Sequence, residues 1–191
     1  MAKLFFRYSS MGAGKTLDLL RSNYNYNENN KKTLCLISGK DNRYGKDKIT
    51  SRIGISTNAI SIYDETNIFE LVKDKIDISC IFVDEIQFLT KEHIIQLSDI
   101  VDKLNIPVIC YGLRSDFQMN PFLSSSYLMA ICDEIQEIKS ICWCGKKAII
   151  NARIVNGQIS EQGDQILVGD KNYISLCRKH FKEKNLGKNI L

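Results

Sequence analysis

The chain has 191 residues, a formal net charge of +4 and 44% hydrophobic residues. This length suits one core domain with a small appendage, and the composition excludes a disordered chain, a collagen-like fibre and a disulfide-stabilised miniprotein. A charge of +4 is too small to indicate nucleic acid or an anionic membrane as a partner, so neither is expected.

Alternating apolar runs and helical spacings predict a regular succession of strands and helices up to about residue 138. In chain order we expect a strand at 3–8, a helix at 15–28, a strand at 33–38, a long loop at 39–58, a strand at 59–62, a helix at 67–75, a strand at 79–83, a helix at 91–104, a strand at 107–111, a helix at 121–132 and a strand at 134–138. Strands that alternate with helices imply right-handed crossovers. The expected fold is therefore α/β, with a parallel sheet covered by helices on both faces.

The character of the sequence changes after about residue 139, where cysteines, lysines and short β-like pieces replace the alternation of strands and helices. We therefore predict two domains, a core of residues 1–138 and a small C-terminal domain of residues 139–191.

Targeting signals and cysteine usage point to the cytoplasm. The N-terminal residues lack the apolar run of about 7–15 residues that a secretion signal needs, and no stretch reaches the roughly 18 apolar residues of a membrane span. In a reducing compartment the seven cysteines are not expected to form disulfides. Four of them lie in apolar surroundings and are expected to be small buried side chains: Cys35, Cys80, Cys110 and Cys132.

A phosphate-binding loop is predicted between the first strand and the first helix. The segment SSMGAGKT at 9–16 fits the pattern GxxxxGK[ST] except at Ser9. In such a loop the backbone N–H groups face the polyphosphate of ATP, Lys15 reaches the β- and γ-phosphates, and Thr16 offers its hydroxyl to Mg²⁺. The candidate nucleotide-binding residues are Ser9, Ser10, Met11, Gly12, Ala13, Gly14, Lys15 and Thr16.

A second motif follows the strand at 79–83, which ends in Asp84 and Glu85. An acid at this place holds Mg²⁺ directly or through water, which is the role expected of Asp84. Glu85 is the candidate general base, which would orient a hydroxyl or a water for attack on the γ-phosphate. The two motifs indicate a P-loop NTPase or kinase and leave the choice between water and a substrate hydroxyl open.

A metal site is predicted in the C-terminal part. Cys142 and Cys144 form a C-x-C pair, and Cys177 and His180 form a C-x-x-H pair. Two close pairs of such ligands suit a tetrahedral Zn²⁺ ion, and four protein ligands leave no open position, which indicates a structural site. The alternative is three buried thiols and a histidine near the end of the chain.

Six short segments, in the same order along the chain, make the sequence similar to the type II thymidine kinases. The matching segments are SSMGAGKT at 9–16, KDNRY at 40–44, DEIQF at 84–88, GLRSDF at 112–117, LVGD at 167–170 with Tyr173, and CRKH at 177–180. The resemblance covers about residues 3–181. The chain departs from the family pattern at Ser9, Ser10 and Gly12 in the phosphate loop, and at Arg114, where many members carry Asp.

The resemblance implies a P-loop (RecA-like) sheet with a zinc-binding "lasso" domain, and transfer of the γ-phosphate of ATP, with Mg²⁺, to the 5′-hydroxyl of thymidine, with deoxyuridine as a further acceptor. Glu85 would be the base on that hydroxyl, Gln87 would belong to the nucleotide site, and a lasso loop of about residues 156–173 would hold the thymine through backbone groups. The residues around the nucleoside would be Met11, Leu113, Phe117, Phe122 and Tyr173. The family also implies a homotetramer and feedback inhibition by thymidine triphosphate.

Several of these residues have a simpler interpretation. Core packing accounts for Leu113, Phe122 and the further candidate Phe88 about equally well. The basic residues Arg43 and Arg52 would either approach the phosphates or be solvated at the surface. Arg153 would either reach the active site or lie outside it, and His93 is expected at the surface.

The alternative function is a nucleic-acid-stimulated P-loop ATPase with a zinc ribbon as binding module. A third interpretation is a nucleotide-dependent binding switch without catalysis, which the acid next to Asp84 argues against.

Overall fold

The computed structural model describes residues 1–41, 43–166 and 172–187. Its centre is a sheet in which the described strands follow the order β5-β2-β6-β7-β1-β8, and every neighbouring pair is parallel. These strands are β1 (Leu4–Tyr8), β2 (Thr33–Ser38), β5 (Ile60–Ile62), β6 (Cys80–Asp84), β7 (Val108–Gly112) and β8 (Glu134–Glu137). The expected α/β fold with a parallel sheet is therefore confirmed.

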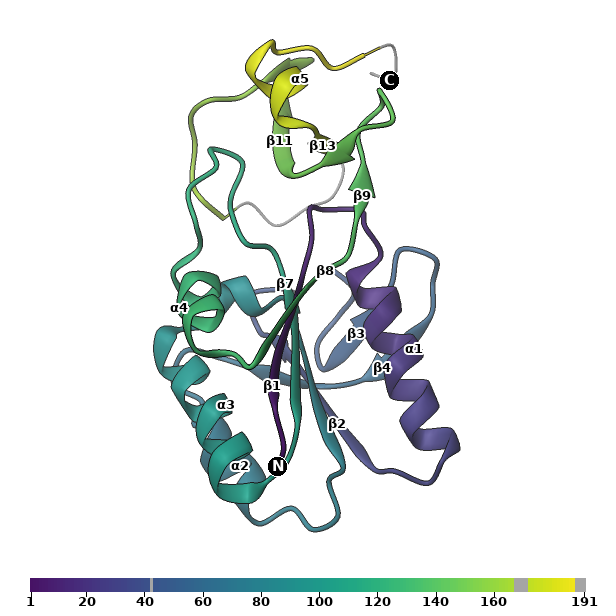
Figure 1. The fold of residues 1–191 in the computed structure, drawn as a ribbon, viewed down its shortest axis with the longest axis vertical. Helices are drawn as coiled ribbons and strands as arrows, with labels where there is room; N and C mark the ends of the chain where they lie inside the picture. The colour runs from purple at the N-terminus through teal and green to yellow at the C-terminus, as the bar shows by residue number, and fades with distance from the viewer. Residues whose placement is uncertain (42, 167–171, 188–191) are drawn as a thin grey trace.

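Helices cover both faces of this sheet, as Figure 1 shows. One face carries α1 (Lys15–Glu28), and the other carries α2 (Ile68–Lys73), α3 (Lys91–Leu104) and α4 (Leu123–Ile131). Successive strand residues point to opposite faces. In β6, Ile81 and Val83 belong to the buried cluster under α3, whereas Cys80 and Phe82 belong to the cluster under α1. Burial on both faces explains why the strands read as continuous apolar runs.

The segment expected to be a long loop contains a small hairpin of β3 (Lys48–Thr50) and β4 (Ser56–Asn58). The prediction of an unstructured loop over 39–58 is thus wrong for this part. Ile49 is fully buried in the cluster under α1 and gives the hairpin its anchor. A strand of three residues is too short to show an alternating pattern in the sequence.

A second difference between prediction and structure lies at the start of α3. His93, expected at the surface, is buried and closes a capping box: its N–H donates to Thr90 Oγ1, and its Nδ1 accepts from the Thr90 N–H, both at 3.2 Å. Its Nε2 lies 3.0 Å from the carbonyl oxygen of Thr66 and so carries the proton. Burial lowers the pKa of His93 below its ordinary value.

The cysteines of the sheet behave as apolar side chains. Cys35, Cys80 and Cys110 are buried, as expected, whereas Cys132 is only partly buried against the cluster under α3. Burial raises the pKa of Cys35 and of Cys80 to about 12, and it raises that of Cys110 as well. These thiols stay protonated and serve packing.

The C-terminal segment, meaning the described residues from 139 to 187, stands beyond the carboxyl ends of the sheet strands (Figure 1). Its elements are β9 (Ser140–Ile141), β10 (Lys147–Ala148), β11 (Ile150–Val155), β12 (Gln158–Ile159), β13 (Tyr173–Leu176) and α5 (Arg178–Lys182). It has a small buried cluster of its own, which includes Cys142, Ala152, Leu176 and Cys177. In the part of the chain that the structure describes, no helix has the length and apolar character that crossing a membrane requires.

Candidate active site

The phosphate loop leaves the carboxyl end of β1 and leads into α1. Gly14 is the residue that caps α1, and its φ of 84° is left-handed backbone that a glycine adopts without strain. Lys15 is buried, and its Nζ donates to Ser9 Oγ and to the carbonyl oxygen of Ser10, each at 3.1 Å. The burial lowers the pKa of Lys15. Ser9, the departure from the glycine pattern, thus supplies a hydroxyl that holds this lysine.

Asp84 lies beside the loop at the end of β6, with β7 between β6 and β1. Its Oδ2 accepts a hydrogen bond from Thr16 Oγ1 at 2.9 Å, and its Oδ1 accepts one from the Glu85 N–H at 3.0 Å. Burial, together with the negative charge of Glu85, raises the pKa of Asp84 above its ordinary value. A hydroxyl and a carboxylate in contact are a donor set that fits Mg²⁺.

Glu85 holds its carboxylate at the cavity through a left-handed backbone conformation, with φ 52° and ψ 43°. Arg43 donates to Oε1 and Gln87 donates to Oε2. The Arg43 guanidinium also binds both carboxylate oxygens of Asp41, at 2.7 and 2.8 Å. Arg43 is therefore an ion-pair partner of the candidate base, while Asn42 of the same motif lies outside the described residues.

Gln87 connects the candidate base to the end of β7. It lies in the short helix η1 (Ile86–Phe88), and its Oε1 accepts a hydrogen bond from the Leu113 N–H at 2.9 Å. A Cβ on Gly112 would lie 2.5 Å from that oxygen. Only a glycine therefore lets the amide approach, and the amide in turn sets the orientation of Glu85.

These groups surround a cavity of about 240 Å³. Eleven of the predicted site residues line it: Met11, Gly12, Gly14, Lys15, Thr16, Glu85, Gln87, Leu113, Phe117, Phe122 and Tyr173. Arg43, Arg52 and Phe88 line it as well. Four predicted residues lie beside it and not in its lining: Ser9, Ser10, Ala13 and Asp84.

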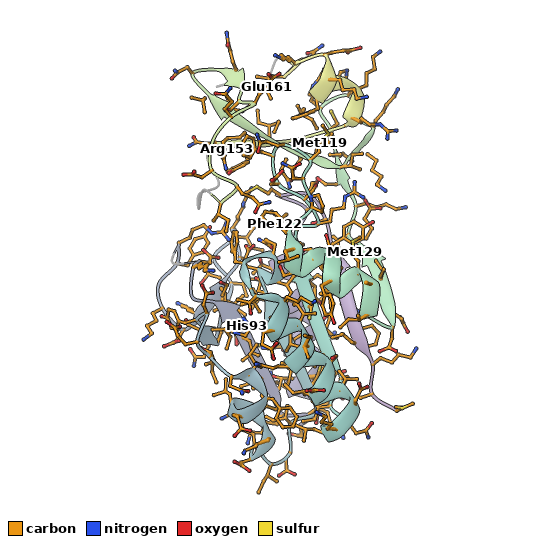
Figure 2. The ribbon with its side chains drawn as sticks, turned by 90° about the vertical axis from the view of Figure 1, so that its left-hand side faces the viewer. His93, Met119, Phe122, Met129, Arg153 and Glu161 are labelled. Carbon is orange, nitrogen blue, oxygen red and sulfur yellow. The ribbon has the colours of Figure 1, made fainter. Side chains whose placement is uncertain are left out.

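Aromatic side chains form one end of the cavity. Phe117 is 1% exposed, and the Arg153 guanidinium carbon lies 3.8 Å from its ring centre. Arg153 also donates from Nε to the Tyr173 hydroxyl at 2.9 Å. The rings of Phe88 and Phe122 meet edge to face, with their centres 6.4 Å apart. Figure 2 shows Phe122 where the helical part of the molecule meets the C-terminal segment, which carries Arg153.

The loop 113–122 reaches from β7 to the C-terminal segment. Asp116 accepts hydrogen bonds at Oδ1 from the backbone N–H groups of Gln118 and Asn120, and at Oδ2 from Gln165 Nε2 at 3.0 Å. Gln118 donates to the carbonyl oxygen of Glu161 at 2.7 Å. Asp116, next to Phe117 in the sequence, thus fixes the loop 113–122 and connects it to the segment that contains Gln165. The predicted motif at 167–170 lies outside the described residues.

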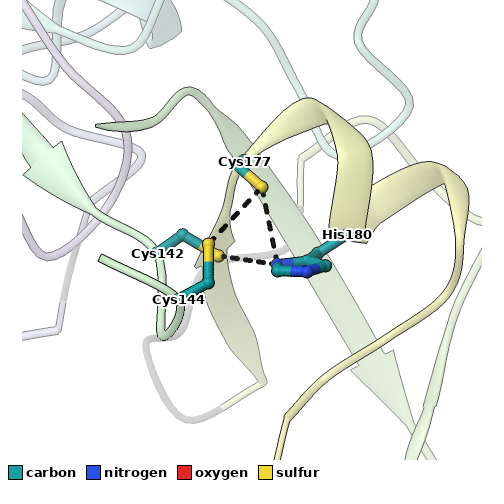
Figure 3. Close-up of side chains that lie close together, drawn as sticks. All are labelled: Cys142, Cys144, Cys177 and His180. Carbon is teal, nitrogen blue, oxygen red and sulfur yellow. Dashed lines mark hydrogen bonds between the residues drawn. The ribbon is translucent and has the colours of Figure 1, made fainter. Parts of the chain in front are cut away.

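The predicted metal ligands Cys142, Cys144, Cys177 and His180 do come together, as Figure 3 shows. The Nδ1 of His180 is 3.4 Å from the sulfur of Cys142 and 3.5 Å from that of Cys177, and the sulfurs of Cys144 and Cys177 are 4.0 Å apart. Zn–S bonds of about 2.3 Å in a tetrahedron place two sulfurs about 3.8 Å apart. The four side chains therefore fit a zinc ion. Trp143 stacks on His180, with ring centres 4.2 Å apart.

The contacts that join distant parts of the chain were not predicted. Asn151 and Ser175 bind the backbone of Met11, and Gln165 binds Asp116. Each of these contacts depends on strand register or loop path, for which the sequence contains no local signal.

Comparison with known proteins gives a consistent result. The family model described as thymidine kinase matches residues 2–181. A thymidine kinase of Francisella tularensis is 50% identical over 195 residues, covering 96% of this chain and 98% of that protein. Those of Haemophilus influenzae and Lactiplantibacillus plantarum are 49% and 46% identical, with 96% and 95% of this chain and 98% and 96% of those proteins covered.

Among solved structures, a Pif1 helicase from Candida albicans has a TM-score of 0.43 at 16% identity, over 73% of this chain and 36% of that one. A similarity this low bears on neither fold nor function. The match to the family model spans almost all of the chain, from the phosphate loop to the candidate zinc ligands Cys177 and His180. The chain therefore belongs to the thymidine kinase family.

Proposed function

We propose that this chain is an ATP-dependent thymidine kinase that transfers the γ-phosphate of ATP to the 5′-hydroxyl of thymidine. One observation carries the proposal: a phosphate loop and the carboxylate of Glu85 line the same cavity as a group of aromatic and apolar side chains. Such a cavity suits a neutral base at one end and a polyphosphate at the other. The family assignment supports the same reaction.

ATP binds with its phosphates on the loop of residues 9–16. The backbone N–H groups of the loop and of the first turn of α1 bind the phosphate oxygens, and Lys15 contributes a positive charge. Mg²⁺, held by Thr16 and Asp84, supplies charge neutralisation on the transferred phosphate. Gln87 belongs to this side of the site through its bond to Glu85.

Glu85 accepts the proton of the 5′-hydroxyl. The hydroxyl oxygen forms a bond to the γ-phosphorus, the bond from that phosphorus to the bridging oxygen of ADP breaks, and ADP leaves with the bonding electrons. Arg43 and Gln87 hold the carboxylate from both oxygens, so its orientation is set before the substrate binds.

The nucleoside lies against Met11, Leu113, Phe117, Phe122 and Tyr173. Their apolar surfaces suit a pyrimidine ring. Thymidine and deoxyuridine differ by one methyl group only, so the pocket can distinguish them only through its contacts with that group. Since a methyl group in an apolar pocket is worth about 1–3 kcal/mol, we infer that deoxyuridine is also phosphorylated.

Zn²⁺ bound by Cys142, Cys144, Cys177 and His180 supplies structural stability to a second domain of residues 139–191, which has a small apolar core. The core domain comprises residues 1–138.

From the family resemblance we further propose a homotetramer, inhibition by thymidine triphosphate and a cytoplasmic location. Light scattering during size-exclusion chromatography tests the assembly, and addition of thymidine triphosphate to the assay tests the inhibition.

The function is tested with ATP that carries a labelled γ-phosphate. We expect the label on thymidine, and ADP release that depends on thymidine and does not respond to single-stranded DNA. ADP release driven by single-stranded DNA, with no label on any nucleoside, would overturn the proposal in favour of a nucleic-acid-stimulated ATPase.

A further inference from the structure

Met11, at the turn of the phosphate loop, is bound through both of its backbone polar groups. Its N–H donates to Asn151 Oδ1 at 2.7 Å, and its carbonyl oxygen accepts from Ser175 Oγ at 2.6 Å. Both partners belong to the C-terminal segment, 140 and 164 residues further along the chain. The loop is therefore held from outside the sheet that carries it.

The two partners face each other in one antiparallel pair of strands. Asn151 on β11 is directly opposite Ser175 on β13. One rung of this sheet thus presents an acceptor and a donor that match the N–H and the C=O of a single residue. Asn151 is 3% exposed, and its Nδ2 donates to the carbonyl oxygen of Ser115 at 3.3 Å. That second bond leaves Oδ1 as the atom that faces Met11.

The residues that follow Ser175 in the chain are buried. Leu176, fully buried in the C-terminal segment, follows Ser175 directly, and the next residue is the predicted zinc ligand Cys177. In contrast, the loop contains Gly12 and Gly14, both with positive φ, and glycine gives the backbone wide conformational freedom. The hydrogen-bonded Met11 thus lies next to the loop residues with the greatest backbone freedom.

We propose that Asn151 and Ser175 are positioning residues for phosphoryl transfer, which act through Met11. This inference rests on the proposed function and deepens it. Asn151 accepts from the Met11 N–H, and the N–H groups from Gly12 onward, next to this anchor, are offered to phosphate. The rung holds these groups in their binding arrangement before ATP arrives, which lowers the entropy that the loop loses on binding. Through Ser115 it also joins the loop to the segment that carries Phe117.

The test compares Ser175→Ala and Asn151→Ala with the double variant. Each loses one hydrogen bond to Met11, so we expect the KM for ATP to rise about 3- to 10-fold. In the double variant the increase should be smaller than the product of the single effects, because both bonds hold the same residue. Ser175→Thr keeps a hydroxyl on the strand and should restore most of the ATP affinity.

Ser98→Ala is the matched control. The Ser98 hydroxyl also donates to a backbone carbonyl, that of Ile95 at 2.7 Å, but it lies in α3 and away from the cavity. This variant should keep the wild-type KM for ATP. If the rung were only a structural contact, Ser175→Ala and Ser98→Ala would both lower the unfolding midpoint and both keep that KM, which would overturn the inference.

A readout independent of catalysis separates this inference from the proposed function. Calorimetry with a non-hydrolysable ATP analogue should show the same 3- to 10-fold loss of affinity in both single variants. Unchanged analogue affinity in both would reject the positioning role even if thymidine is phosphorylated. Weakened analogue affinity, in a protein that labels no nucleoside, would support the positioning role and reject the kinase proposal.

Discussion

At Glu85, local backbone strain and side-chain partners act together. The residue has a positive φ, which is uncommon for a residue with a side chain and is concentrated at functional sites. Both carboxylate oxygens have a fixed donor, from Arg43 and from Gln87. The ionised form is the one that accepts these bonds, and it is also the form that a general base requires.

Glu85→Gln should retain nucleotide binding and lose most of the turnover. The amide is close in size to the carboxylate but cannot accept the proton of the 5′-hydroxyl, and such base catalysis contributes about 10²- to 10⁴-fold. Steady-state kcat and the Kd of an ATP analogue measure the two effects. Glu92→Gln, an exposed acid in the first turn of α3, is the control and should keep the wild-type kcat. A Glu85→Gln protein with near-normal kcat would rule out the base assignment.

At the scale of the element, α3 shows what local sequence can and cannot predict. Its bounds, Lys91–Leu104, match the prediction because apolar residues recur at helical spacing. The role of His93 was missed, because the reciprocal bond in a capping box normally comes from Glu or Gln. The β3–β4 hairpin was missed because each strand has three residues and is held by tertiary burial of Ile49.

His93→Gln should make the stability less dependent on pH. The folded-state pKa of His93 lies below its ordinary value near 6.5, so the unfolded chain binds more protons, and stability falls as the pH drops below about 6.5. Glutamine keeps an acceptor for the Thr90 N–H but does not titrate. We expect the variant to be less stable by about 1 kcal/mol at pH 7.5, through the lost bond to Thr66.

The difference in unfolding free energy between His93→Gln and the wild type should then shrink as the pH is lowered to 5.5. Urea denaturation at three pH values measures it. The two proteins differ only at position 93, so contributions from the rest of the chain cancel in this difference. Parallel stability profiles for the two proteins would contradict the assignment.

At the scale of the whole molecule, the cavity is made by two parts of the chain that meet beyond the sheet. Residues within one motif could be identified from the sequence, since a strand followed by a glycine-rich turn and a helix is a local pattern. The contacts of Asn151 and Ser175 with Met11 could not be identified, because they depend on the register of β11 against β13 and on how this pair docks. The groups proposed for chemistry could thus be predicted from the sequence, whereas Asn151 and Ser175, which hold the loop at Met11, could not.

Cys144→Ser should destabilise the C-terminal segment. Loss of one of four ligands weakens metal binding, which contributes directly to folding in small metal domains. A loss of about 2–3 kcal/mol corresponds to a Tm lower by roughly 5–10 °C for a chain of this size. Trp143, the sole tryptophan of the sequence, stacks on His180, so its fluorescence should change as well.

Cys132→Ser is the control for this change, because Cys132 is only partly buried and lies outside the cluster. It should keep the wild-type metal content, measured by atomic absorption, and the wild-type tryptophan emission. A zinc-free preparation with unchanged Tm and emission would refute the metal assignment.

The buried, protonated sulfurs of Cys35, Cys80 and Cys110 have a practical consequence. Alkylation needs an accessible thiolate, so these three resist maleimides while the chain is folded. The adducts counted by intact mass spectrometry are therefore expected at Cys132 and, where no ion is bound, at the proposed zinc ligands Cys142, Cys144 and Cys177. The number of maleimide adducts on the native protein would thus report the metal occupancy in a single mass spectrum.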